Sequence, residues 1–138
     1  MTIAIIAHDN KKADMVAFVL KRIEFFKGKD IKIISTGTTG NHMRHAGIEN
    51  VECVKSGPLG GDAQIASRLV DGSIDAVLFF IDPLYSHAHE VDIHMLMRLC
   101  NVYDVPLATN YHTANYLIKG FKYEKLKKEK NANQTNKI

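Results

Sequence analysis

The sequence predicts an α/β fold: a single-domain, doubly wound sandwich with a mainly parallel sheet of about five strands and helices on both faces. Three observations predict it. The chain has 138 residues, the length of one domain. Short apolar runs alternate along it with longer stretches of helical periodicity. The run AVLFF at residues 76–80 lacks polar alternation, which is typical of a parallel strand that is buried on both faces.

Strands are predicted where short apolar, β-branched runs end in polar or glycine-rich segments. They cover residues 3–7, 31–35, 51–55, 76–80 and 106–109. Helices are predicted between them, where apolar residues recur every three or four positions. They cover residues 13–26, 41–46, 62–71, 91–103 and 112–118. In the fourth helix, one face holds four apolar residues that we expect to pack on the sheet. They are Ile93, Leu96, Met97 and Cys100.

Composition and charge narrow the class of protein. Hydrophobic residues make up 46% of the chain and charged residues 24%, as in ordinary globular proteins. The net charge of +3 is concentrated in residues 122–138, which hold six lysines against two glutamates. Residues 1–121 are close to neutral, with twelve basic and thirteen acidic side chains. We therefore expect one folded domain over residues 1–121, a partly disordered lysine-rich tail over 122–138 that is helical in its first half, and no nucleic-acid partner.

Neither a membrane segment nor a disulfide is predicted. No apolar run approaches the roughly 20 residues that a membrane-spanning helix needs, and the apolar stretch in MTIAIIAHDN is too short for a signal peptide. We expect a cytoplasmic protein with no membrane partner. Cys53 and Cys100 lie among apolar neighbours without the CxxC spacing of zinc or redox sites. Both are predicted to be reduced thiols of the core.

The loops after the first four predicted strands are rich in polar residues and glycine. They read AHDNKK, STGTTG, KSGPLGGD and DPLYSHAHEVD. In doubly wound folds, ligands bind outside the carboxyl ends of the strands, near the point where the strand order reverses. We therefore expect the functional site to lie at this edge of the sheet.

The second of these loops has the composition of an anion site. Residues 36–40, TGTTG, supply three hydroxyls and a tight turn whose N–H groups open onto a helix N-terminus. The segment is neither GxGxxG nor GxxxxGK[ST], so it matches neither a dinucleotide-binding motif nor a P-loop. A structural N-cap role for Thr38 or Thr39 is therefore as good an interpretation as phosphate binding.

The first and third loops add candidate anion donors and a carboxylate. Ser56 and Gly57 supply a hydroxyl and a backbone N–H, and Lys12 can aim its ammonium group at the same anion or remain solvated. Asp62 opens the next predicted helix. It is either an N-cap, whose pKa backbone N–H groups would lower, or a carboxylate that acts on the bound ligand.

The fourth loop offers further titratable groups. Asp82 follows the strand directly, while His89 and Asp92 lie where the next helix begins. The stretch HAHEVDIH also allows a metal site through His87, His89 and His94. We regard that as the weaker interpretation, because no second group of ligands with a recognised spacing completes it.

Taken together and in order, five segments closely resemble the methylglyoxal synthase family. They are AHD with a lysine close behind, STGTTGN, SGPLGGDAQIA, LFFIDPL, and HEVD ahead of an LMRL helix, and they span residues 3 to 118. The same fold resembles allosteric domains of carbamoyl-phosphate synthetase and the cyclohydrolase half of a purine-synthesis enzyme, which lack this full set. The family's usual HDPDV is replaced here by residues 89–93, HEVDI, so the rigid turn that proline provides is lost.

The resemblance implies an activity and a set of site residues. It implies that residues 1–121 form a catalytic domain converting dihydroxyacetone phosphate to methylglyoxal and inorganic phosphate, with no metal or organic cofactor. The implied catalytic residues are Asp62, His89, Asp92 and Asp9, with Asp82 as a supporting carboxylate. The implied substrate-binding residues are His8, Lys12, Thr36, Gly37, Thr38, Thr39, Ser56, Gly57 and His89. Because family members form hexamers, a homohexamer is implied as well.

Two other classes of function share these features. A non-catalytic regulatory domain of the same fold would bind a phosphorylated metabolite unchanged. An isomerase of triose or sugar phosphates would form the same enediolate without releasing phosphate. The presence of Asp62 together with His89 argues against the regulatory domain, since binding alone needs no base.

Overall fold

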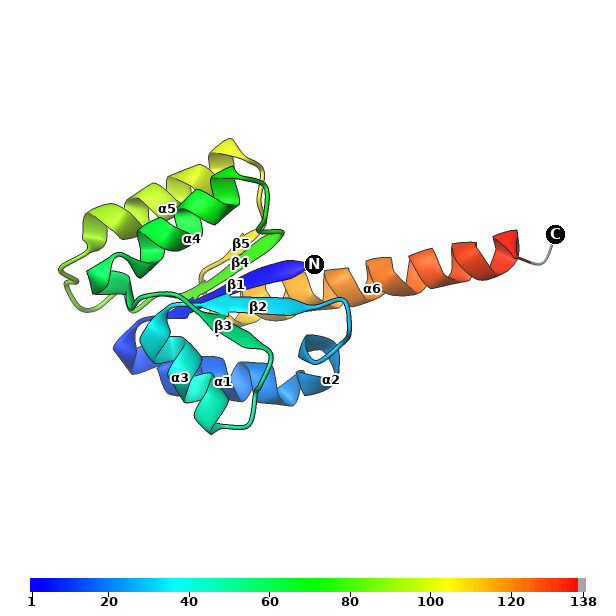
Figure 1. The fold of residues 1–138 in the computed structure, drawn as a ribbon, viewed down its shortest axis with the longest axis horizontal. Coiled ribbons are helices and arrows are strands. Elements are labelled where there is room, and N and C mark those ends of the chain that lie inside the picture. Colours follow the sequence, from blue (N-terminus) through cyan, green and yellow to red (C-terminus); the bar gives the residue numbers. More distant parts are fainter. Residues whose placement is uncertain (137–138) are drawn as a thin grey trace.

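Five parallel strands form one sheet in the computed structural model, which describes residues 1–136 (Figure 1). The strands are β1 (Thr2–Ala7), β2 (Lys32–Ser35), β3 (Val51–Cys53), β4 (Ala76–Phe80) and β5 (Leu107–Ala108). Their order across the sheet is β3-β2-β1-β4-β5, and every neighbouring pair is parallel. The predicted fold class and all five predicted strands are confirmed.

Helices cover both faces of the sheet (Figure 1). They are α1 (Lys12–Lys21), α2 (Ile23–Phe26), α3 (Gly37–His45), α4 (Gly61–Val70), α5 (Glu90–Val102) and α6 (Tyr111–Thr135), with 3-10 turns η1 (Asp9–Lys11) and η2 (Gly57–Leu59). The single helix predicted over residues 13–26 is in fact two. Arg22 leaves the helical region between them, with φ −119° and ψ 26°, and its guanidinium group donates to the Phe18 carbonyl and to Asn115 of α6.

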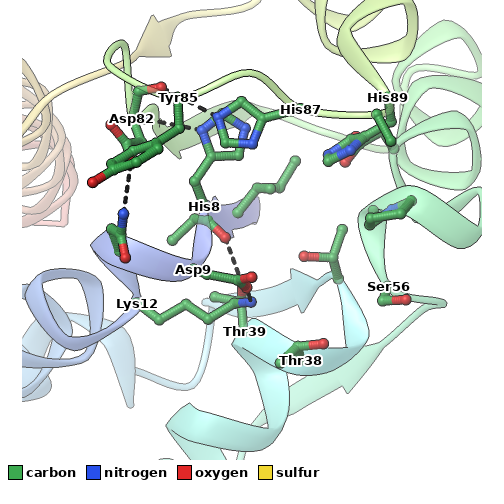
Figure 2. Close-up of a pocket in the computed structure, with 18 of the residues that line it drawn as sticks. His8, Asp9, Lys12, Thr38, Thr39, Ser56, Asp82, Tyr85, His87 and His89 are labelled. Carbon is green, nitrogen blue, oxygen red and sulfur yellow. Dashed lines mark hydrogen bonds and ion pairs between the residues drawn. The ribbon is translucent and has the colours of Figure 1, made fainter.

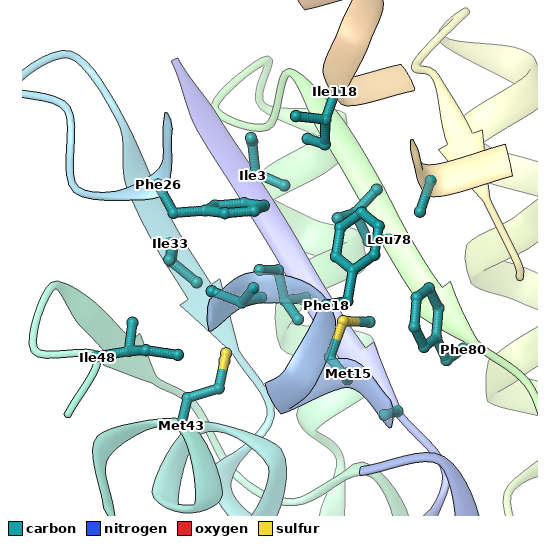
Figure 3. Packing of buried hydrophobic residues seen from close by; sticks show 14 of the residues in the cluster. Ile3, Met15, Phe18, Phe26, Ile33, Met43, Ile48, Leu78, Phe80 and Ile118 are labelled. Carbon is teal, nitrogen blue, oxygen red and sulfur yellow. The ribbon is translucent and has the colours of Figure 1, made fainter. Parts of the chain in front are cut away.

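Two hydrophobic clusters, one on each face, hold the layers together. Along β1, alternate residues point to opposite faces. Ile3 (Figure 3) and Ile5 pack with α1, α2, α3 and α6, whereas Ala4 and Ile6 pack with α4 and α5. On α5, Ile93, Leu96 and Cys100 are buried and Met97 is partly buried, as predicted. Both cysteines are free thiols, Cys100 buried and Cys53 half-buried.

Helix α3 begins four residues earlier than predicted, so the TGTTG segment is its first turn rather than a loop. Two glycines allow this. The Gly37 N–H donates to the Lys55 carbonyl (3.2 Å), which joins the start of α3 to the segment after β3. A Cβ on Gly40 would lie 2.3 Å from Cys53 Sγ, so only glycine lets α3 lie this close to β3.

Helix α6 also extends further than predicted. The lysine-rich tail is helical as far as Thr135, not only in its first half, and residues 137–138 lie outside the described part of the chain. The last buried residue of α6 is Ile118, and residues 122–136 are all exposed. The helix therefore projects away from the sheet (Figure 1). Within residues 1–136, no helix is both long and apolar enough to cross a membrane.

Deleting residues 122–138 should leave the folded domain intact, because none of its described side chains is buried. We expect the midpoint of thermal unfolding, followed by circular dichroism, to change by less than about 3 °C. As a control in the full chain, Ile118→Ala should cost about 2–4 kcal/mol, since it empties a buried site. A large loss of stability on deletion would show that the tail is part of the domain.

Gly61→Ala should destabilise the fold strongly. A Cβ on Gly61 would lie 1.8 Å from the Lys55 carbonyl oxygen, and a backbone atom cannot move aside without shifting the strand end. We expect the free energy of unfolding in urea to fall by about 3 kcal/mol. Gly120→Ala is the matched control, because its Cβ would enter open space on α6 and should add about 0.5–1 kcal/mol. Equal effects of the two substitutions would contradict this packing.

Candidate active site

A cavity of about 490 Å³ opens at the carboxyl ends of the strands (Figure 2). The chain runs from β1 outward to β2 and β3 on one side and returns to β4 and β5 on the other, so the strand order reverses between β1 and β4. This is where ligands bind in doubly wound folds. Eleven residues proposed from the sequence line the cavity: His8, Asp9, Lys12, Thr36, Thr38, Thr39, Ser56, Gly57, Asp62, Asp82 and His89.

Two of the proposed residues do not line the cavity. Gly37 faces the segment after β3, where a Cβ would lie 3.0 Å from the Val54 carbonyl oxygen, so its place is in packing rather than in the cavity wall. Asp92, on the first turn of α5, is not among the lining residues, although its charge acts on Asp62. Conversely, Asn10, Pro58, Tyr85, Ser86 and His87 line the cavity without having been assigned to it.

Asp62 and His89 form a close pair at the centre of the site. Asp62 is fully buried in the first turn of α4, and its Oδ2 lies 3.5 Å from Nε2 of His89, the residue just before α5. Neither carboxylate oxygen has a hydrogen-bond partner in the described chain, and neither does Nδ1 of His89. Gly57 makes the approach possible, because a Cβ there would lie 3.0 Å from His89 Nε2.

The environment of Asp62 favours its protonated form. Burial raises the pKa of the carboxyl, the neighbouring Asp92 raises it further, and His89 opposes both. The N-cap interpretation of Asp62 is wrong: the N-cap of α4 is Gly60, and no side-chain capping bond is made there. A buried carboxylate without hydrogen bonds is costly, but it is a stronger base than a solvated one.

Groups able to bind an anion surround this pair. The N-cap of α3 is Thr36, so Thr38 and Thr39 contribute first-turn N–H groups, which have no acceptor within the helix. The alternative prediction, that Thr38 or Thr39 is the N-cap, is therefore wrong. The Thr39 hydroxyl is occupied, since it donates to the Ala7 carbonyl at 3.3 Å. Ser56 and Gly57 add a hydroxyl and a backbone N–H from the next loop.

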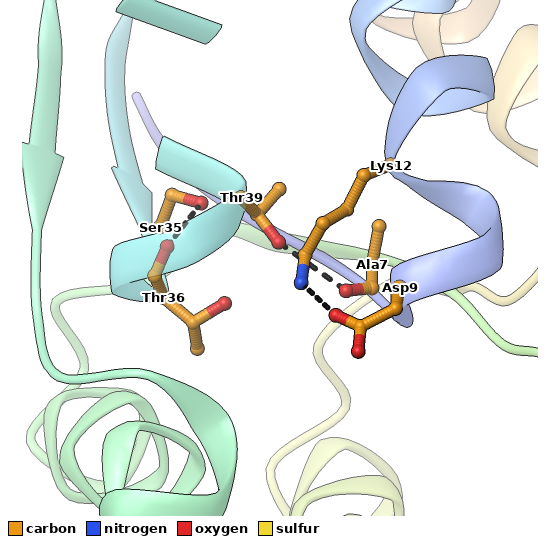
Figure 4. Close-up of polar contacts among 6 residues, drawn as sticks. All are labelled: Ala7, Asp9, Lys12, Ser35, Thr36 and Thr39. Atoms are coloured by element: carbon orange, nitrogen blue, oxygen red, sulfur yellow. Dashed lines mark hydrogen bonds and ion pairs between the residues drawn. The ribbon is translucent and has the colours of Figure 1, made fainter. Parts of the chain in front are cut away.

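Lys12 supplies a positive charge to the cavity wall (Figure 4). Its side chain is buried, and its ammonium group bonds to the carboxylate of Asp9, which is almost fully exposed. Lys12 lowers the pKa of Asp9, so this carboxylate is a weaker base than Asp62. The catalytic role implied for Asp9 stays a prediction. An ammonium group has three donors, so Lys12 can bind Asp9 and an anion together.

Asp82 joins the loops that follow β1 and β4. Its backbone N–H donates to Nδ1 of His8 at 2.8 Å, and its carboxylate accepts from Asn10 at 2.9 Å. The ring of His8 stacks on that of His87, with centroids 3.6 Å apart. From the sequence, His87 was considered only as a metal ligand. Its position two residues before His89, in the loop at the reversal of strand order, is the feature that could have predicted its place in the cavity wall.

The three histidines of HAHEVDIH do not converge as metal ligands. His94 is exposed on α5 and lies 3.9 Å from Glu90, whereas His87 and His89 face the cavity. Across residues 1–136, no group of three or more His, Cys, Asp or Glu side chains is arranged to hold a metal ion.

Known proteins share this chain's sequence and fold. The family model described as the MGS-like domain matches residues 14–109. The chain belongs to this family. Methylglyoxal synthases in it include those of Borreliella afzelii, 51% identical over 118 residues (86% of this chain, 91% of that protein), and Bacillus subtilis, 45% identical over 119 residues (86% and 85%).

Two further relatives extend the comparison for this MGS-like chain. The crystal structure of methylglyoxal synthase from Elizabethkingia anophelis superposes with a TM-score of 0.78 at 41% identity, covering 85% of this chain and 76% of that one. An uncharacterized protein of Synechocystis is 53% identical over 117 residues, but the match covers only 27% of its length. The family resemblance inferred from the five segments is confirmed.

Asp62→Asn should stabilise the protein at neutral pH. The folded-state pKa of Asp62 lies above its ordinary value, so the carboxyl contributes stability at low pH and loses that contribution as the pH rises through the folded-state pKa. We expect a higher free energy of unfolding in urea for the variant at pH 8, and a smaller gain at pH 4.

Asp9→Asn is the control, since Lys12 lowers the pKa of Asp9. It should lose a little stability at pH 8, by less than about 1 kcal/mol, because the pair is exposed on one side. If Asp62→Asn were destabilising at pH 8, the carboxylate would have a stabilising partner after all.

Proposed function

We propose that this protein is a methylglyoxal synthase, a carbon–oxygen lyase that converts dihydroxyacetone phosphate to methylglyoxal and inorganic phosphate. The observation that carries the proposal is the buried Asp62 carboxylate. It has no hydrogen-bond partner among residues 1–136, lies 3.5 Å from His89 and faces a cavity lined by anion donors. The methylglyoxal synthases at 45–51% identity support it.

Asp62 acts as the general base. Removing a proton from the hydroxymethyl carbon beside the carbonyl gives an enediolate, and the proton passes to the Asp62 carboxylate. Burial of Asp62 supplies the basicity that a solvated aspartate, with a pKa of about 3.9, lacks. His89 Nε2 lies next to Asp62 Oδ2, so the imidazole can donate to the substrate oxygen on which negative charge develops.

Phosphate release follows from the conformation in which the substrate is held. When the C–O bond to phosphate is perpendicular to the enediolate plane, the π electrons expel phosphate, which takes the proton of the remaining hydroxyl group. The enolate of methylglyoxal that is left takes up a proton to give the product. Lys12, the N–H groups at the start of α3, and Ser56 with Gly57 can fix that torsion and stabilise the charge of the leaving phosphate.

Of the two alternative classes, the geometry of the site argues against the regulatory domain. A regulatory domain needs the anion donors but has no use for a buried carboxylate whose pKa is raised. Such a carboxylate lowers the stability of the fold at neutral pH. An isomerase would use the same base, so only the fate of the phosphate separates it from a synthase. The homohexamer and the cytoplasmic location stay predictions.

The direct test is turnover of dihydroxyacetone phosphate. We expect purified protein to release inorganic phosphate and trapped methylglyoxal in equal amounts. Asp62→Asn should lower kcat by about 10³-fold or more, as loss of a general base and its positioning does, while inorganic phosphate still binds in isothermal titration calorimetry.

Asp92→Asn serves as the comparison, since Asp92 lies near Asp62 but outside the cavity wall. Its effect on kcat should be much smaller than that of Asp62→Asn. Substantial activity in Asp62→Asn would move the base role to another carboxylate. Conversion of the substrate to glyceraldehyde 3-phosphate without phosphate release would identify an isomerase, and binding without turnover would identify a regulatory domain.

A further inference from the structure

His87 lies in the active-site wall, in the segment between β4 and α5, without a role in the chemistry described above (Figure 2). Its ring stacks on that of His8, with a centroid distance of 3.6 Å and an interplanar angle of 19°. The two rings come from loops that follow neighbouring strands, β1 and β4. The stack therefore joins the two sides of the point where the strand order reverses.

One residue, Asp82, fixes both rings through its backbone. Its N–H donates to Nδ1 of His8 (2.8 Å), and its carbonyl oxygen lies 3.2 Å from Nε2 of His87. A carbonyl oxygen only accepts, so the proton in the second bond is on Nε2 of His87. The flat face of His87 is then held parallel to His8 and limits tilting of that ring.

The same bonds define the protonation of His8. Because Nδ1 of His8 accepts a hydrogen bond, the proton of its neutral ring is on Nε2. That atom is buried without a partner in the described chain, and an unsatisfied buried donor at an active site points to a ligand. Burial, followed by the neighbouring His87 and His89, lowers the pKa of His8 to about 4, so the ring is neutral at pH 7.

We propose that His87 is a positioning residue, which by stacking on His8 holds the neutral Nε2–H group of that ring in the orientation that donates to the substrate. The proposal rests on the proposed function. The face-to-face stack carries it, because the Asp82 N–H fixes only one edge of the His8 ring and Phe79 meets the ring edge to face, whereas His87 covers its face.

Two substitutions at position 87 separate stacking from simple filling of space. His87→Phe keeps a flat ring over His8, whereas His87→Leu fills similar volume without one. With dihydroxyacetone phosphate as substrate, we expect His87→Leu to lower kcat about 10- to 100-fold, as a misplaced contact group does. The KM of this variant should change by less than about threefold, because ground-state binding is kept. His87→Phe should retain kcat within about threefold of the parent.

Nitrogen-15 NMR of the histidine side chains gives a readout that does not depend on turnover. In the parent and in His87→Phe, His8 should show one tautomer, with Nε2 protonated and Nδ1 not. In His87→Leu the tautomer should stay the same, since the Asp82 N–H still donates to Nδ1. The side-chain signals of His8 should instead shift and broaden, because the ring then samples more than one orientation. His45→Ala, at an exposed histidine on α3, is the matched control and should change neither the kinetics nor the His8 signals.

Two results would overturn the proposal. Either His87→Leu keeps the parent kcat and the sharp, unshifted His8 signals of the parent, or His87→Phe loses as much activity as His87→Leu. A parent protein without synthase activity would contradict the proposed function instead, and the NMR comparison would still show whether His87 fixes His8.

Discussion

The active site depends on one unfavourable arrangement, the burial of the Asp62 carboxylate without a hydrogen-bond partner in the part of the chain that the structure describes. Placement in the first turn of α4 helps an anion, since a helix N-terminus favours negative charge by about 0.3–1 kcal/mol. Desolvation nevertheless dominates and raises the pKa of the carboxyl. The two apolar clusters, one on each face of the sheet, stabilise the fold enough to offset this cost. The folded protein can therefore hold a strong base in place before substrate binds.

Glycines bring the loops close enough to build the site. Gly61 packs against the Lys55 carbonyl, and Gly37 donates to that same oxygen, so the starts of α3 and α4 meet on one backbone atom. Gly57 then leaves just enough space for His89 beside Asp62. These glycines matter because they have no Cβ. At each of them, a Cβ would collide with a second backbone segment or with the Asp62–His89 pair.

The sequence predicted what depends on local patterns and missed what depends on contact between loops. The β4 run AVLFF and the periodicity of α5 follow from burial, so both were predicted within one residue. The start of α3 was predicted four residues too late, because the segment TGTTG by itself resembles a turn. The contacts that make it helical, the Gly37–Lys55 hydrogen bond and the packing of Gly40 on Cys53, cannot be read from the sequence. The charge on α6 suggested partial disorder, yet Lys-rich segments have high helix propensity and the helix runs to Thr135.

The site residues show the same division. Asp62, His8 and Lys12 could be named because each follows a strand or opens a helix at the functional edge. The states of Asp62 and His8 could not be predicted, because each depends on neighbours from another segment: burial together with His89 and Asp92 for the pKa of Asp62, and the Asp82 backbone for the tautomer of His8. A sequence motif therefore specifies which groups reach a site, whereas contacts between loops decide whether each acts as base, donor or counter-ion. In this protein the loop after β4 takes part in both sets of contacts, with His89 beside Asp62 and the Asp82 N–H on His8, and it lies next to the loop after β1 because β1 and β4 are neighbours at the reversal of strand order.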